Sequence, residues 1–174
     1  FREVLGSVDA VSIATPTPLH FEIARECLER GVHVLVEKPI TDTIEEAREL
    51  VELAARKSLI LQVGHLERFN PAIQALAGTL RTPRFVESHR LAPFRERGTD
   101  VNVVLDLMIH DIDLIQSLVR SPIVSIDAVG TSVFSSGLDI ANARIRYANG
   151  CVANTTASRV SMKTERKLRL FQDD

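Results

Sequence analysis

The chain of 174 residues carries 45% hydrophobic and 25% charged side chains, the composition of an ordinary globular protein with one domain or parts of two. Its net charge of −2 at pH 7 gives no electrostatic basis for binding nucleic acid or an anionic membrane, so we expect neither as a partner. No apolar run reaches the ~20 residues that a membrane span requires, and no signal-peptide pattern opens the chain. Because its two cysteines, Cys27 and Cys151, lie in unrelated contexts, we expect buried thiols and a cytoplasmic protein.

Strands and helices alternate in the first third of the chain. Thr43 begins one helix, because Glu46 follows three residues later in the arrangement of a capping box, and Gly31 ends another. Strands that alternate with amphipathic helices of this length form right-handed crossovers in a parallel sheet, so residues 1–64 are predicted to be an α/β unit. The expected strands are residues 9–15, 32–36 and 59–64, and the expected helices are residues 20–30 and the segment after Thr43.

The end of the second expected strand carries a charged pair, Glu37-Lys38. Open α/β sheets bind their ligands at the carboxyl ends of their strands, which is where this pair lies. Pro39 has a fixed φ and disfavours the helical conformation for Lys38, so stiff backbone holds the lysine. Taken alone, the pair is explained equally well by a ligand site and by a salt bridge at the surface.

A dinucleotide-binding sheet begins with a strand and a Gly-x-Gly-x-x-Gly turn, and an acidic ribose ligand follows ~20 residues later. Neither feature precedes the first expected strand, and Phe1-Arg2-Glu3 is typical of the middle of a helix. We therefore expect Phe1 to lie inside a longer fold whose start is absent from the chain.

The remaining residues, 65–174, contain one long apolar helix and several strands. Short turns such as Ala148-Asn149-Gly150 separate the strands, so mostly antiparallel pairing is expected. The expected strands are residues 84–91, 124–134, 141–147, 151–157 and 167–171, and a short helix is expected from Pro71 to about Leu80.

The long helix, residues 101–119, combines a broad apolar surface with ionisable side chains. Asp106 and His110 are four residues apart and are therefore expected to stack on one helical face, with Asp113 one turn further along. Three interpretations of this face are open: a structural cap or salt bridge, a metal site, and a catalytic group. No metal is predicted, because no cluster of further ligands is evident in the sequence.

Three motifs match the pattern of one enzyme family. They are Ile13-Ala14-Thr15-Pro16 with His20, the segment 31–39 that ends in Glu37-Lys38-Pro39, and the Asp-x-x-x-His-x-x-Asp spacing of Asp106, His110 and Asp113. Together they resemble the Gfo/Idh/MocA family of NAD(P)-dependent oxidoreductases, from the fourth strand of its Rossmann domain into its second domain. The resemblance implies that residues 1–64 are the C-terminal part of a Rossmann-like dinucleotide-binding domain. Residues 65–174 would then be a substrate and oligomerisation domain that lacks its end.

The resemblance also implies the fold class, α/β followed by α+β. The C-terminal part of a Rossmann-like parallel sheet would be followed by an open, mostly antiparallel sheet that helices cover on one face. The other face commonly forms a subunit interface in the family, so a homo-oligomer through the open sheet is expected. The expected cofactor is NAD or NADP, because the residues that decide between them are absent from the chain.

By resemblance, Lys38, Asp106 and His110 converge over the nicotinamide, and these are the expected catalytic residues. Either His110 or Lys38 could take the proton of the reacting hydroxyl, or the lysine ammonium could polarise its oxygen. Asp106 would orient His110 or hold a neighbouring substrate hydroxyl. The expected cofactor-binding residues are Thr15, Pro16, His20, Glu37, Lys38 and Gln62.

Residues 64–71 and 104–113 resemble, more narrowly, the branch of the family that oxidises the 3-hydroxyl of UDP-N-acetylglucosamine ahead of a 3-amino sugar for lipid A. Arginine side chains are good ligands for the diphosphate of such a substrate. For Arg95 and Arg97, a position in a solvated loop is at least as good an explanation as a role in binding the diphosphate. The alternatives are an inositol or free-sugar dehydrogenase, and a catalytically silent dinucleotide or sugar sensor. The expected substrate-binding residues are His65, Glu67, Arg68, Asp106 and Arg159.

Overall fold

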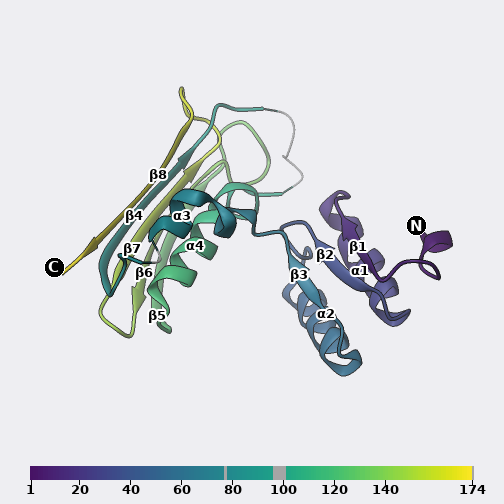
Figure 1. Ribbon diagram of the computed structural model, residues 1–174. Helices are drawn as coiled ribbons and strands as arrows, with labels where there is room; N and C mark the ends of the chain where they lie inside the picture. Colours follow the sequence, from purple (N-terminus) through teal and green to yellow (C-terminus); the bar gives the residue numbers. More distant parts are fainter. Residues whose placement is uncertain (77, 96–100, 174) are drawn as a thin grey trace. The chain divides into compact units, whose positions relative to one another are not determined.

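The computed structural model describes residues 1–76, 78–95 and 101–173. They form two compact units, Phe1–His65 and Leu66–Asp174, and each unit contains its own β-sheet. The elements of each unit can be followed in Figure 1. Within the described residues, no helix has the length and apolar character needed to cross a bilayer.

The first unit is a parallel three-stranded sheet with the strand order β1-β2-β3, which confirms the expected α/β unit. Two helices link the strands and pack against each other. Their apolar faces form one core with the sheet, in which Leu28, Val36 and Leu50 are fully buried. The elements are η1 (Arg2–Val4), β1 (Ala10–Ile13), η2 (Thr17–Leu19), α1 (His20–Glu29), β2 (His33–Val36), α2 (Ile44–Lys57) and β3 (Leu61–Val63).

Local sequence explains where these helices begin and end. The Thr43 hydroxyl accepts the N–H of Glu46 at 3.3 Å, and the Glu46 carboxylate accepts the N–H of Thr43 at 3.4 Å, so the predicted capping box is confirmed. Gly31 follows α1 with a φ of +83°, a left-handed conformation that glycine adopts without strain.

The second unit contains a five-stranded sheet with the order β5-β6-β7-β4-β8. Three of its pairings are antiparallel and one, between β4 and β7, is parallel, so the expected open and mostly antiparallel sheet is confirmed. The parallel pair was not predicted, because alternation along a strand identifies its buried face and not its neighbour. The strands are β4 (Pro83–Leu91), β5 (Ile123–Thr131), β6 (Ile140–Tyr147), β7 (Val152–Ser158) and β8 (Glu165–Gln172).

One face of this sheet is covered by the helix α4 (Ile109–Val119), which contacts β4 and β7 (Figure 1). Val86, Ile115 and Ile145 are buried together between the helix and the sheet. The opposite face presents polar side chains that line a shallow depression: Glu87, His89, Asp127, Asn142, Arg144, Asn154 and Thr156.

The segment 101–119 differs from the single regular helix that the sequence predicts. It begins as a π-helix, η4 (Val104–Met108), and continues as α4. Each hydrogen bond of a π-helix spans five residues, whereas each bond of an α-helix spans four. Asp106 lies in the π-helix and His110 in α4, so the prediction of one regular α-helical face is wrong.

Other predicted element ends also differ from those of the structure, most clearly at α3 and β5. The helix α3 (Pro71–Leu76) begins at Pro71 as expected but ends at Leu76, before the expected Leu80. The strand β5 ends at Thr131 and not at Phe134, because the backbone there turns to bond with a carboxylate described below. A short 3-10 turn, η3 (Leu66–Phe69), precedes α3.

Candidate functional site at the β2 end and the η4–α4 helix

The carboxyl ends of the three parallel strands are aligned by backbone hydrogen bonds. The N–H of Glu37 donates to the carbonyl of Ile13 at 2.9 Å, and the N–H of Gly64 donates to the carbonyl of Val36 at 2.7 Å. Lys38, which follows directly and is half-buried, precedes a cis peptide bond to Pro39. The charged pair thus lies at the edge of the sheet where α/β folds bind their ligands.

Glu37 lies against the backbone of Gly64 at this edge. A Cβ added to Gly64 would lie 3.1 Å from the Glu37 Cδ atom, closer than a comfortable van der Waals contact. Glycine at position 64 therefore leaves the space that the Glu37 carboxylate occupies. Thr15, Pro16 and Gln62, which were also expected to bind a cofactor, are exposed.

His20 joins two of the strand ends from inside the unit. Its side chain is buried, with Nδ1 2.8 Å from the carbonyl oxygen of Pro39 and Nε2 2.9 Å from that of Thr15. The ring therefore connects the turn after β1 with the segment that carries Lys38. In the described residues its polar contacts are with the backbone of the unit.

In the second unit, Asp106 and His110 are both half-buried on the η4–α4 segment. The neighbouring Asp113 receives a two-pronged ion pair from Arg68, whose Nε lies 2.7 Å from Oδ2 and whose Nη2 lies 2.5 Å from Oδ1. This hydrogen bonding raises the pKa of Arg68. Arg68 lies in the short 3-10 turn η3 and is exposed. Its bonds to Asp113 on α4 orient the guanidinium, which remains open to solvent.

A second group of ion pairs links α4 to the strand β4, and the sequence analysis did not predict it. Arg90, buried on β4, donates to Asp111 from Nη2 at 2.8 Å and to Glu67 from Nη1 at 3.3 Å. Burial raises the pKa of Asp111, against the opposing effect of Arg90. For Glu67, burial would raise the pKa, but bonds from Asn70 and Arg90 lower it overall. An arginine in the buried register of a strand was the sequence signal for this group.

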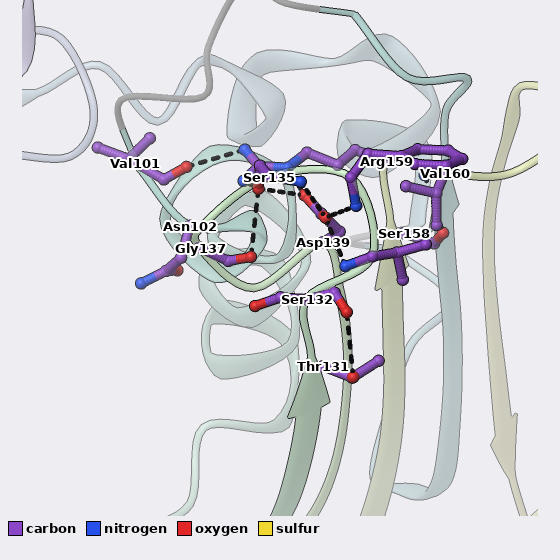
Figure 2. A network of polar contacts seen from close by, with 12 residues as sticks. Val101, Asn102, Thr131, Ser132, Ser135, Gly137, Asp139, Ser158, Arg159 and Val160 are labelled. Carbon is purple, nitrogen blue, oxygen red and sulfur yellow. Dashed lines mark hydrogen bonds and ion pairs between the residues drawn. The ribbon is translucent and has the colours of Figure 1, made fainter.

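Arg159, expected to bind substrate, is 4% exposed and bonds inside the unit (Figure 2). Its guanidinium donates to Asp139, Ser135 and the backbone of Val101. The other arginines considered for a diphosphate differ: Arg95 is exposed, and Arg97 lies outside the described residues, while His65 is half-buried at the end of the first unit.

The described residues include no group of three or more His, Cys, Asp or Glu side chains placed to hold a metal ion. The candidate residues at these two places carry an ammonium (Lys38), an imidazole (His110) and a carboxylate (Asp106). Such groups accept, donate and orient protons.

Comparison with known proteins identifies both units. Residues 1–65 match the oxidoreductase family model for the NAD-binding Rossmann fold of Gfo/Idh/MocA proteins, and residues 73–173 match the model for the C-terminal domain of that family. The UDP-N-acetylglucosamine 3-dehydrogenase of Acidithiobacillus ferrooxidans is 45% identical over 173 residues, which cover 98% of this chain and 55% of that protein.

A solved structure of the same Acidithiobacillus ferrooxidans enzyme is 44% identical and has a TM-score of 0.94, with 99% of this chain and 57% of that chain covered. The scyllo-inositol 2-dehydrogenase (NAD(+)) of Bacillus subtilis is 28% identical over 169 residues, which cover 88% of this chain and 49% of that protein. The chain thus spans about half the length of the curated relatives it matches. With both family models matched along its length, the chain belongs to the Gfo/Idh/MocA family of oxidoreductases.

Proposed function

We propose that the protein is an NAD(P)-dependent dehydrogenase that oxidises the 3-hydroxyl of UDP-N-acetylglucosamine. The observation that carries this proposal is the 45% identity, over 98% of the chain, to a protein of that name. An inositol or free-sugar dehydrogenase is the second candidate, favoured by the 28% identity to scyllo-inositol 2-dehydrogenase. A 3-amino sugar destined for lipid A would be the downstream use of the product in the first case.

We assign cofactor binding to residues 1–64 of the first unit, at the carboxyl ends of its strands. Exposed Thr15, Pro16 and Gln62, with half-buried Glu37 and Lys38, offer an accessible polar edge of the kind that dinucleotides use in α/β sheets. His20 would support this edge from beneath through its two backbone contacts. When bound, NAD or NADP supplies the hydride acceptor.

Loss of a hydride from an alcohol carbon requires the hydroxyl proton to leave as well. Lys38, Asp106 and His110 are the groups that we propose for this task. An imidazole exchanges protons near neutral pH, so His110 can act as the base, and an ammonium at Lys38 can polarise the oxygen or share the proton transfer. Asp106 would orient the histidine or hold a neighbouring substrate hydroxyl.

The second unit, Leu66–Asp174, together with His65 before it, would supply the sugar-nucleotide contacts. Arg68 is supported as a diphosphate ligand because its two bonds to Asp113 use Nε and Nη2, so the N–H donors of Nη1 point elsewhere. His65 and Glu67 flank it in sequence and are partly accessible. Arg159 is enclosed by partners of its own unit, and a different role is argued for it below.

We also propose self-association through the sheet face opposite α4. The depression there mixes both charge signs, with Glu87 and Asp127 beside Arg144, so two copies related by a two-fold axis can offer each other opposite charges.

We propose a cytoplasmic location. Burial raises the pKa of the Cys27 and Cys151 thiols, which suits their persistence as thiols in the reducing cytoplasm.

The test is turnover of three compounds by the full-length protein with NAD and with NADP. We expect nicotinamide reduction with UDP-N-acetylglucosamine to be at least about tenfold faster than with myo-inositol or free N-acetylglucosamine, because binding energy from the nucleotide is used at the reacting carbon. Equal rates with the three compounds would contradict the substrate assignment and favour the second candidate. Cofactor binding with no turnover would favour a silent sensor.

A further inference from the structure

A buried ion pair at one end of the second unit's sheet joins distant parts of the chain. Asp139 directly precedes β6, Arg159 directly follows β7, and their Oδ1 and Nε atoms are 2.8 Å apart (Figure 2). The two strands are antiparallel, so the start of β6 and the end of β7 lie side by side at the same end of the sheet. The two side chains are 0% and 5% exposed, which leaves the pair closed to solvent.

The loop before β6 folds around the Asp139 carboxylate. Oδ2 accepts the backbone N–H groups of Val133, Phe134 and Ser135 at 2.8, 2.7 and 2.9 Å, and Oδ1 accepts the Ser135 hydroxyl at 2.6 Å. Burial by itself would raise the pKa of Asp139, but the bonds from Ser135 and Arg159 hold it well below its ordinary range. The carboxylate therefore stays charged, and residues 132–139, called here the Asp139 loop, wrap around it through these bonds.

Arg159 and the Asp139 loop both hold the segment that leads into η4. The Nη1 atom of Arg159 donates to the carbonyl of Val101 at 2.8 Å. Two residues later, the N–H of Val103 donates to the carbonyl of Leu138 in the loop at 2.9 Å. Val103 is fully buried, so this short segment is fixed by directional bonds and by packing.

The same segment caps the π-helix that carries Asp106. The side-chain oxygen of Asn102 accepts the N–H groups of Val104 and Leu105 at 3.0 and 3.1 Å. The backbone carbonyl of Asn102 accepts the N–H of Asp106 itself at 3.0 Å. A Cβ added to Gly137 would lie 3.9 Å from the Asn102 Cα, so the Asp139 loop passes close to this cap.

We propose that Asp139 and Arg159 are positioning residues: by fixing residues 101–103 they set where η4 begins, and thereby where Asp106 and His110 lie. The inference rests on the proposed function, since it is the dehydrogenase reaction that would need these two side chains in place. Charge-assisted bonds between buried partners are short and directional, which suits a device that must hold a backbone to a fraction of an ångström. This role also accounts for a buried arginine that donates to Asp139, Ser135 and Val101 of its own unit.

The test replaces the planar guanidinium and keeps its charge. Arg159→Lys cannot bond Asp139, Ser135 and Val101 together, because an ammonium lacks the fork of donors. We expect kcat to fall by roughly 10–100-fold, since small misplacements of reacting groups have effects of this size, with the sugar-nucleotide KM changed less than about threefold. In an Asp106→Asn background the same substitution should lower kcat by less than about threefold more, because coupled residues are not additive.

The matched control is Val86→Ala, a truncation in the β4 core away from residues 101–103. It should destabilise the unit yet leave kcat within about twofold of wild type below its unfolding temperature. Arg159→Lys with a kcat no lower than this control, or with a full additive effect in the Asp106→Asn background, would overturn the positioning role.

Hydrogen exchange measured by mass spectrometry reports on the segment without any substrate. Peptides that cover residues 102–110 should exchange faster in Arg159→Lys than in wild type, and at the wild-type rate in Val86→Ala. Unchanged exchange in Arg159→Lys would overturn the anchoring whatever the activity. Wild-type protein that turns over none of the test compounds would instead overturn the proposed function, and the exchange data would still decide the anchoring.

Discussion

Tyr147 shows how one buried side chain makes stability depend on pH. It is 3% exposed, and its hydroxyl has no hydrogen-bond partner within the described part of the chain. Burial raises its pKa to about 12, whereas a tyrosine in an unfolded chain titrates near 10. The folded state thus keeps the Tyr147 proton to a higher pH than the unfolded state does. The contribution of Tyr147 to stability is therefore complete below about pH 10 and is lost as the pH rises to about 12.

Tyr147→Phe should be at least as stable as wild type at pH 7 and should lose less stability at alkaline pH. Removal of an unsatisfied buried hydroxyl relieves a desolvation penalty of about 1–3 kcal/mol, so we expect a neutral or stabilising effect of up to that size. Denaturant unfolding at pH 7 and at about pH 11, the middle of the interval set by the two pKa values, measures both effects. A variant clearly less stable than wild type at pH 7 would show that the hydroxyl is bonded.

Lys38 is the residue on which the proposed chemistry depends most in the first unit. Lys38→Met keeps an unbranched, flexible side chain and removes the ammonium with its charge and its proton, so turnover should fall by roughly 10²–10⁴-fold while the fold is retained. The control is Lys163→Met, because that lysine is 78% exposed on a turn outside the proposed site. Steady-state kinetics of both variants decide the matter: turnover of Lys38→Met within about threefold of Lys163→Met would remove Lys38 from the reaction.

At the scale of elements, Arg90 attaches the helix α4 to the strand β4. Removing one partner of a buried ion pair leaves the other charge uncompensated, so Arg90→Met should lower the free energy of unfolding by about 3–5 kcal/mol. The double variant Arg90→Met/Asp111→Leu removes both charges and should recover most of this loss. Denaturant unfolding of the two variants provides the measurement, and equal losses would show that the effect is packing and not the stranded carboxylate.

The sequence was sufficient for the elements of both sheets, because alternation and helical periodicity report which faces are buried. It was insufficient for the π-helix η4, whose start depends on the side chain of Asn102 and on the contact of Val103 with Leu138, a residue far away in the sequence. The parallel β4–β7 pair was also out of reach, since strand partners are chosen by tertiary packing.

The candidate site divides in the same way. The roles of Lys38, Asp106 and His110 were inferred from the spacing of sequence motifs, and they stay predictions. The partners of Arg68 and Arg159 could not be predicted, because the sequence around an arginine does not distinguish one that binds a ligand from one that pairs with a carboxylate of the protein. Arg68 is oriented by Asp113 and Arg159 is enclosed by Asp139, and both facts come from the folded chain.

For the whole molecule, the two units carry different parts of one proposed reaction. The first unit presents the accessible edge of a parallel sheet. The second presents a helical segment that carries ionisable side chains and is held at its start and middle by two buried ion pairs. Two family models match the chain along its length, so its family is known. The proposed substrate rests on similarity to relatives that are about twice as long.

The most direct measurement of the proposed reaction follows the hydrogen itself. Full-length protein is given UDP-N-acetylglucosamine that carries deuterium at carbon 3 of the sugar, together with NAD or NADP, and the reduced cofactor is weighed by mass spectrometry. We expect one deuterium in each reduced cofactor molecule, because the hydride must come from the carbon that is oxidised. Reduced cofactor without deuterium would contradict oxidation at the 3-hydroxyl.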